Sequence, residues 1–302
     1  MAIVYTQNVA PSTVIPAPNV ATYSTRKTYV TPAEFKAAPT GVDVSQLVPG
    51  GTTQQQAAAL VMQLQRASAY ADNFCQKVIA ATVDVQAGHY RVSRDVALGA
   101  VIKVPLDNTP VVAISDIRIG ATPGALALIP TPGNLWIGRK TATIPVAATY
   151  GTRVFAQVSY VNGWANTALT AVGNPGTLSI TVASTLGIMP GQQLNIQSPT
   201  NAETVTVDPS FTPSNTNINA LVPITTPLVG TYSIGDTVTA FPQDIKQAVI
   251  LIAKSLIRTR GSESIVISST TSQPDSIDKL EHGVTSDLDM ALDLLAPYRR
   301  AA

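Results

Sequence analysis

Residues able to do acid–base, nucleophilic or metal chemistry are few and widely spaced in this sequence. The histidines, His89 and His282, lie in different kinds of segment, and no cysteine or carboxylate cluster with metal-ligand spacing surrounds either of them. The single cysteine, Cys75, falls on the apolar face of an expected helix, where a thiol packs as a small hydrophobic group. A catalytic thiol would need a histidine and positive charge beside it. We therefore expect no catalytic, metal or cofactor site.

Glycines and asparagines give two further motifs to weigh. Four glycines recur in a stretch with few charges: Gly173, Gly176, Gly187 and Gly191. They follow no phosphate-loop pattern and no helix comes after them, so we interpret them as turns. Asn217 and Asn219 fit either a sugar-binding loop or an ordinary solvated loop. Acidic residues are scattered, so the paired carboxylates of a glycosidase cannot be located.

Basic residues gather in two short clusters, Arg258-Thr259-Arg260 and Tyr298-Arg299-Arg300. Both lie near expected helix ends, where positive charge satisfies the last carbonyls and the helix dipole. The 19 Lys and Arg balance 18 Asp and Glu, so net charge predicts no strong attraction to DNA or membrane. Non-specific contact with DNA, which would depend on salt, stays open.

Composition favours an assembly subunit over an enzyme. The 302 residues suffice for one large domain or two ordinary ones, and only 12% are charged and 5% aromatic. One cysteine excludes an intramolecular disulfide framework. The N-terminus has no basic region followed by an apolar run, so we expect synthesis in the cytosol without a secretory signal.

The element expected to organise the chain is a helix over residues 242–261, opened by Pro242 and followed by Gly261. Apolar residues cover most of its surface, which is typical of a buried helix. Its core face is formed by Ile245, Val249, Ile252 and Leu256. At about 25 Å it is too short to cross a membrane, and it contains lysines.

Three more helices are expected. Thr31 caps a short helix that begins with Pro32 and Glu34. A long helix over residues 53–80 carries Cys75 on its apolar face and Asp72 on its polar face. A final helix is stopped by Pro297.

Strands are expected between the helices, which makes the fold class α+β. Residues 82–161 alternate with a period of two and contain turn signals, as in hairpins packed against the helices. Residues 166–240 are nearly free of charge and hold five or six short strand patterns, which fits an inserted small all-β barrel or sandwich. Residues 1–29 are rich in proline and threonine, and fit either a floppy terminus or an extended arm on a neighbouring subunit.

Taken together, three pieces resemble the head-to-tail adaptor (connector, head-completion) proteins of long-tailed bacteriophages. They are YVTPAEFKA at residues 29–37, IKVPLDNTPVVAISDIRIG at 102–120, and QDIKQAVILIAKSLIRTRG at 243–261 paired with the terminal ALDLLAPYRR. The β-insertion is similar to modules carried by adaptors of actinobacterial phages. The N-terminal extension and the insertion depart from the minimal family pattern, so the resemblance leaves their roles open.

The resemblance implies a helical bundle with β-hairpins over residues 30–165 and 241–302, assembled as a ring of typically twelve copies. Such a ring lies in the virion neck, beneath the portal protein, where it extends the DNA channel and receives the next neck or tail component. In relatives the C-terminal segment docks on the portal, which would give that role to Leu295, Pro297, Tyr298, Arg299 and Arg300. A different virion part, such as a neck stopper whose β-module binds a partner or a glycan, is the alternative, and an unrecognised hydrolase is a third.

Overall fold

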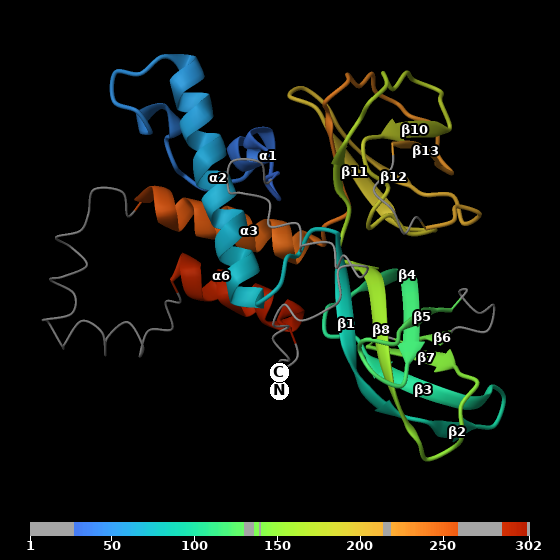
Figure 1. Cartoon of the computed structure of the whole chain (residues 1–302). Helices are drawn as coiled ribbons and strands as arrows, with labels where there is room; N and C mark the ends of the chain where they lie inside the picture. Colours follow the sequence, from blue (N-terminus) through green and yellow to red (C-terminus); the bar gives the residue numbers. More distant parts are fainter. Residues whose placement is uncertain (1–26, 130–135, 139, 214–218, 259–285, 301–302) are drawn as a thin grey trace, which may run out of the picture.

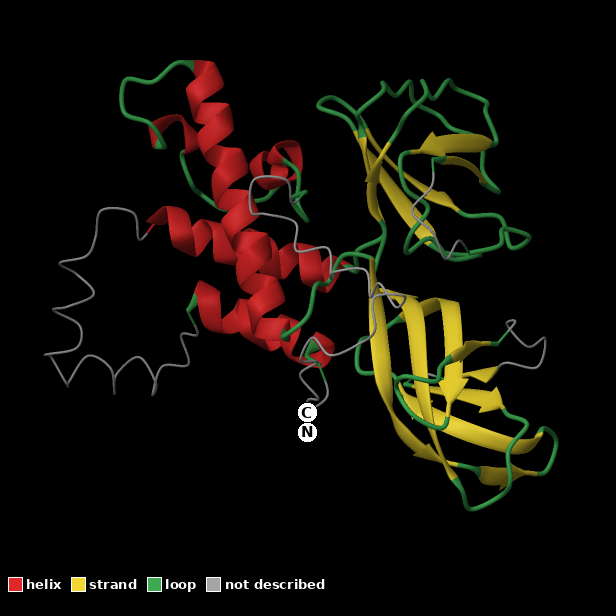
Figure 2. Cartoon of the chain, in the orientation of Figure 1, coloured by secondary structure: helices red, strands yellow, loops and turns green. Residues whose placement is uncertain are grey.

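The computed structural model describes residues 27–129, 136–138, 140–213, 219–258 and 286–300 (Figure 1). Its helices are α1 (Pro32–Ala37), α2 (Thr53–Cys75), α3 (Gln243–Arg258) and α6 (Asp287–Leu295), with short 3-10 helices η1 (Val44–Gln46) and η2 (Ala296–Tyr298). Strands occupy the chain between α2 and α3. The fold is therefore α+β (Figure 2).

α3 lies between α2 and α6 and contacts both (Figure 1). Ile245, Val249 and Ile252 of α3 are completely buried in the core of this helical layer, and Leu256 is partly buried against the same core. Lys246, placed by its spacing on a polar edge, is also buried, at 5% exposure. Gly261 lies outside the described residues.

α1 begins as its sequence predicts. The Thr31 hydroxyl accepts a hydrogen bond from the Glu34 amide at 3.2 Å, and the Glu34 carboxylate accepts one from the Thr31 amide at 2.7 Å. This reciprocal arrangement satisfies two amides that the first helical turn leaves without partners. The predicted cap is confirmed.

α2 is shorter than the helix predicted over residues 53–80, because it ends at Cys75. Gln76 has left-handed backbone, with φ of 56°. Asp72, predicted on the polar face, is only 4% exposed, and its carboxylate accepts hydrogen bonds from the Ile79 amide at 2.9 Å and the Tyr29 hydroxyl at 2.5 Å. These bonds turn the chain back over the end of the helix, which accounts for its early stop.

Residues 82–162 form two four-stranded antiparallel sheets rather than hairpins packed on the helices. One sheet has the order β1-β8-β4-β5 and the other β2-β3-β7-β6. The strands, in chain order, are β1 (Thr82–Arg91), β2 (Ser93–Asp95), β3 (Gly99–Pro105), β4 (Val111–Gly120), β5 (Ala127–Leu128), β6 (Trp136–Ile137), β7 (Thr141–Pro145) and β8 (Arg153–Asn162). Their buried residues form one core, separate from that of the helices, to which both sheets contribute. The expectation that the hairpins cover the helices is therefore wrong, since each sheet covers the other's apolar face.

Residues 166–240 form a closed six-stranded barrel. Its strands are β9 (Asn166–Ala168), β10 (Ser179–Val182), β11 (Gln193–Gln197), β12 (Ala202–Thr206), β13 (Ala220–Pro223) and β14 (Thr237–Thr239). One sheet has the order β12-β11-β14-β9 and the other is the pair β10-β13. Bridges at Leu169↔Val182 and Val207↔Ile224 join the two sheets on both sides. Among the described residues of this unit, the edge strands of one sheet are thus bridged to those of the other.

We call the two packed sheets of residues 82–162 the β-sandwich. The helical layer, the β-sandwich and the barrel meet at Gly163 and Trp164. Gly163 has φ of +90°, and a Cβ there would lie 2.7 Å from the carbonyl oxygens of Ile79 and Ala80. The Trp164 amide donates to the Ile79 carbonyl at 3.1 Å. Glycine is therefore required where β8 ends, and the turn directs Trp164 toward the helices.

Candidate functional site

The C-terminal segment, expected to project toward a partner, packs against its own chain. The Leu295 side chain is completely buried in the helical core, and the Cys75 thiol lies 3.8 Å from the Leu295 carbonyl oxygen. Leu295 therefore has no surface to offer a portal protein in this conformation. Pro297 and Arg299, by contrast, are exposed.

Tyr298 lies in η2, directly after α6, and contacts the junction of the three units. Its ring meets the Trp164 ring edge-on, with centroids 5.4 Å apart and planes at 77°. Its hydroxyl donates to the Asp244 carboxylate at 3.4 Å. Partial burial and the nearby Asp244 charge raise the pKa of Tyr298, so its hydroxyl stays protonated at neutral pH.

The two arginines that follow behave differently from each other. The Arg300 amide donates to the Cys75 carbonyl at 2.9 Å, and its guanidinium pairs with Asp107 in the loop between β3 and β4. The Arg299 guanidinium lies over the Phe74 ring, 5.1 Å from its centroid, and the residue stays exposed. Arg300 thus fastens the chain end to the sandwich, while Arg299 faces solvent.

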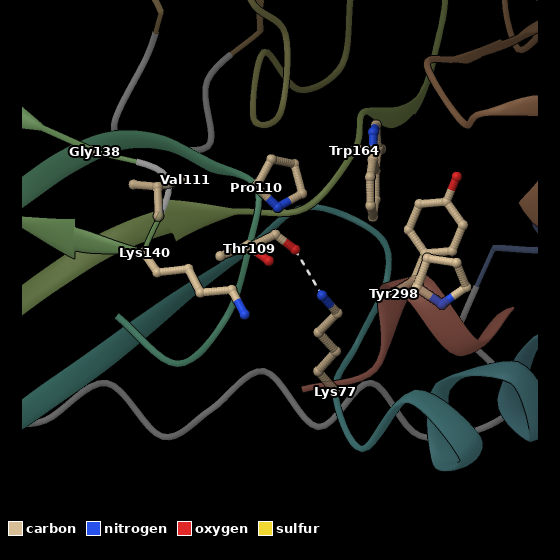
Figure 3. A pocket seen from close by; sticks show the side chains of 9 residues that line it. Lys77, Thr109, Pro110, Val111, Gly138, Lys140, Trp164 and Tyr298 are labelled. Atoms are coloured by element: carbon tan, nitrogen blue, oxygen red, sulfur yellow. Dashed lines mark hydrogen bonds between the residues drawn. The ribbon is translucent and has the colours of Figure 1, made fainter. Parts of the chain in front are cut away.

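A cleft of about 820 Å³ opens beside this segment (Figure 3). Its lining comes from the end of α2, the β3–β4 loop, the β6–β7 turn, the end of β8 and the C-terminal segment. The lining residues are Lys77, Thr109, Pro110, Val111, Gly138, Lys140, Trp164, Pro297 and Tyr298. We call this the basic cleft, since two lysines and no carboxylate line it among the described residues.

The Lys77 ammonium has two contacts in the basic cleft. It donates to the Thr109 carbonyl at 2.7 Å and lies 6.0 Å from the centroid of the Trp164 ring (Figure 3). Burial lowers the pKa of Lys77, and the positive charge of Lys140 lowers it further. Mutual repulsion of two like charges is relieved by a bound anion, which is the chemistry that this arrangement offers.

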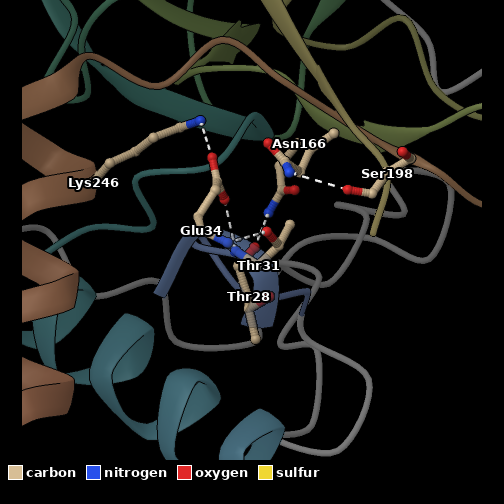
Figure 4. A network of polar contacts seen from close by, with 7 residues as sticks. Thr28, Thr31, Glu34, Asn166, Ser198 and Lys246 are labelled. Carbon is tan, nitrogen blue, oxygen red and sulfur yellow. Dashed lines mark hydrogen bonds and ion pairs between the residues drawn. The ribbon is translucent and has the colours of Figure 1, made fainter. Parts of the chain in front are cut away.

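A second polar cluster joins three remote parts of the chain (Figure 4). The Lys246 ammonium lies 2.6 Å from one carboxylate oxygen of Glu34, whose other oxygen caps α1. The Asn166 side chain, at the start of the barrel, donates to the Thr28 carbonyl at 3.4 Å. Both sides of the ion pair are shielded from water, so the cluster serves to hold α1 on α3.

The candidates for chemistry do not converge. Burial raises the pKa of the Cys75 thiol to about 11, so it is protonated at neutral pH and unsuited to nucleophilic attack. The His89 ring packs edge-on against Phe155, with centroids 5.0 Å apart. His282 and Asn217 lie outside the described residues, and Asn219 accepts a hydrogen bond from Thr170. Within the described ranges no group of three His, Cys, Asp or Glu could hold a metal ion, and no helix is long and apolar enough to cross a membrane.

Sequence reasoning missed the basic cleft because its residues come from five separate segments. Lys77 follows the end of α2 and Lys140 directly precedes β7, and neither belongs to a recognisable motif. Trp164 carried the one usable signal, since it follows an Asn-Gly turn at the end of a strand. The Asn-Gly turn fixes the backbone just before Trp164, and such a turn can be predicted from sequence.

Comparisons with known proteins add little to this geometry. No protein-family model and no curated protein matches the sequence. Among solved structures, one chain from "Neck of empty GTA particle computed with C6 symmetry" aligns with a TM-score of 0.36 and 13% identity, covering 92% of this chain and 95% of that chain. A similarity of this size does not show a shared fold or function.

Proposed function

We propose that the protein is a structural, non-enzymatic component of the neck of a tailed-phage-type particle. In this proposal it forms a ring of about twelve copies, as the resemblance of its motifs to head-to-tail adaptors implies. The ring would join the portal of the DNA-filled head to the next neck or tail component and extend the DNA channel.

One observation supports the proposal most directly: ion pairs join the segments that carry the resemblance. Lys246 of α3 pairs with Glu34 of α1 at 2.6 Å, and Lys254 of α3 pairs with Asp287 of α6 at 2.8 Å. Arg300 pairs with Asp107 in the second motif. Segments up to 212 residues apart therefore form one physical unit, as motifs of a single assembly module should.

The proposed division places two of the three apolar cores in one module. Residues 30–165 and 241–302 would be the adaptor module, with the helical core and the core of the two sheets. Residues 166–240 would be an inserted barrel with its own core, and residues 1–29 an arm. The barrel sequence contains no Lys or Arg. Because a polyanion is bound chiefly through cations, we assign any contact with DNA to the adaptor module and not to the barrel.

Two experiments test the proposal: the mass of the oligomer, and the ability of the chain to complete heads that lack it. Native mass spectrometry of the purified chain, alone and with portal protein, should detect a closed ring or a ring–portal complex. Adding the chain to DNA-filled heads that lack it should allow tails to attach. A chain that stays monomeric with portal present and never binds such heads would overturn the proposal.

For portal docking, the exposed Pro297 and Arg299 are the side chains to test. Arg299→Glu should weaken attachment to portal while leaving the thermal unfolding temperature within a few degrees, because Arg299 is exposed. The matched control is Arg66→Glu, which is exposed on α2. Equal portal binding by both variants would remove Arg299 from the docking surface.

A further inference from the structure

The basic cleft presents positive charge without a carboxylate to balance it. Lys77 and Lys140 both belong to its lining, and no Asp or Glu does among the described residues. The Thr109 carbonyl accepts one hydrogen bond from the Lys77 ammonium, which has three protons to donate. A half-buried ammonium held in one place is pre-organised to receive an anionic group.

The walls of the cleft limit which kind of molecule can carry the anionic group. Trp164 and Tyr298 form an edge-to-face pair on one side, and Pro110 and Pro297 complete an apolar surface beside the lysines. Duplex DNA offers phosphates along a convex backbone that suits open basic surfaces. A concave site with rings and prolines next to two ammonium groups is better suited to an extended peptide that alternates carboxylates with proline or aliphatic side chains.

This chain contains such a peptide. Residues 274–281 read PDSIDKLE. This stretch contains three carboxylates and one lysine, and the residues between the carboxylates include Ile277 and Leu280, with Pro274 before the first. Residues 1–26, which contain three prolines, have no Asp or Glu. Charge complementarity therefore selects residues 274–281 over the N-terminal stretch.

The anchors of the segment and the cleft lie at opposite ends of the helical layer. α3 ends at Arg258 and α6 begins at Asp287, both at the end of the helical layer that lies away from the sandwich (Figure 1). The cleft is lined by Pro297 and Tyr298, which follow the other end of α6. Complementary surfaces at opposite ends of one subunit allow head-to-tail contacts, which close into a ring when the rotation between copies closes and form an open filament when it does not.

We propose that the acidic segment 274–281 of one copy binds in the basic cleft of the next copy. The contact deepens the proposed function, since it would be a subunit interface of the ring. Carboxylates of the segment would pair with Lys77 and Lys140, and its proline and aliphatic side chains would pack on Trp164 and Tyr298.

A charge-exchange experiment tests this contact. The double variant Lys77→Glu/Lys140→Glu reverses the cleft, and Asp275→Lys/Asp278→Lys reverses the segment. Native mass spectrometry at fixed concentration should show at least a tenfold loss of rings for each variant alone. A 1:1 mixture should recover rings in which the two variants alternate, because every interface then joins opposite charges. Lys103→Glu, exposed on β3, is the matched control and should form rings normally.

The remaining outcomes each decide the matter. Rings that persist in both variants would overturn the contact and leave the proposed ring intact. Rings could also form in a single chain that carries all four substitutions but not in the 1:1 mixture. This outcome would overturn the contact between copies, because it would mean that the segment binds the cleft of its own chain. Loss of binding to a 20-base-pair duplex with rings unchanged would reassign the cleft to DNA.

A binding measurement separates failure of the contact from failure of the proposed function. A fluorescent peptide of residues 272–283 should bind the full chain, and bind the reversed cleft at least tenfold more weakly. That result would support the cleft even if the wild-type chain never formed rings. If Lys77→Glu/Lys140→Glu fails to fold, Lys140→Glu alone replaces it, because Lys140 is exposed; equal peptide binding by that variant and by wild type would overturn the proposal.

Discussion

The helical core and the barrel core collect their apolar residues in opposite ways. The helical core draws buried residues from Tyr29 near one end of the chain to Leu295 near the other. The barrel core takes its buried residues from between Ala165 and Val238. Contacts between residues far apart in sequence form later and at a greater cost in chain entropy. We therefore expect the barrel to fold earlier than the helical layer, whose core needs residues from both ends of the chain.

The two regions also use charge differently. The helical layer is tied by ion pairs between distant segments, such as Lys246 with Glu34. The barrel has three acidic residues, and each accepts hydrogen bonds from backbone amides within the barrel: Glu203 from Val229, Asp208 from Ser210 and Asp236 from Ser233. Hydrogen bonds from backbone amides thus satisfy the carboxylates of the barrel in place of ion pairs.

Ile252→Asp should have the largest effect. Ile252 is completely buried in α3, so the substitution places an unpaired charge in the helical core at a cost of about 4 kcal/mol or more. We expect insoluble or unfolded protein, with limited proteolysis leaving a protected fragment that spans the barrel. Met62→Asp, 54% exposed on α2, is the control. A soluble Ile252→Asp chain with a normal unfolding temperature would mean that α3 is not central to this core.

Gly163→Ala should come next, because it acts where the units join. Its Cβ would lie 2.7 Å from two carbonyl oxygens at a φ of +90°, so we expect a loss of about 3 kcal/mol in the free energy of unfolding, measured with urea. Gly176→Ala in the barrel has a similar φ of +84° and no neighbour within 4 Å, and should lose only about 1 kcal/mol. Equal losses would show that strain alone, without the close approach, explains the need for glycine at Gly163.

Local patterns in the sequence were enough for the local features of the fold. The helical period over α3 and the Thr31–Glu34 cap depend on residues within a few positions of each other, and both are seen in the structure. The sequence signal for β7 is weak, because its five residues end in Pro145, and the strand is defined by its pairing with β3 and β6. The pattern of a segment cannot show which distant segment will cover it.

Charged residues show the same limit at the candidate site. Lys246 fits a polar edge by spacing, and it is buried because Glu34 reaches it from another helix. Leu295 fits a docking anchor by its position near the chain end, and it fills the core instead. The basic cleft had no signal in spacing at all, since its two lysines lie in separate segments. Predicting such sites requires the packing of the units to be known first.

The ion pair between Glu34 and Lys246 offers a smaller effect that probes the long-range ties. Lys246→Met alone leaves Glu34 charged and shielded, and Glu34→Gln leaves Lys246 unpaired, so each should lose about 2–3 kcal/mol of unfolding free energy. The double variant should lose less than the sum, because neither charge is then left alone. A double-mutant cycle by urea unfolding measures the difference, and strictly additive losses would show that the two groups do not interact.

Tyr232→Phe in the barrel should have the smallest effect, and it tests a hydrogen bond to a barrel carboxylate. The Tyr232 hydroxyl donates to the Glu203 carboxylate at 3.2 Å, so its removal should lower the free energy of unfolding by about 1 kcal/mol at neutral pH.

Burial and the Glu203 charge raise the pKa of Tyr232 to about 12, above its value of 10.0 in an unfolded chain. A raised pKa means that the folded barrel holds this proton more tightly, so the associated stability is present below pH 10 and is lost as pH rises toward about 12. The barrel sequence has no Lys, Arg, His or Cys and no other tyrosine, so within this unit Tyr232 alone titrates in that range. The stability difference between wild type and Tyr232→Phe should therefore shrink between pH 10 and 12, and a difference independent of pH would show that folding does not raise the pKa of Tyr232.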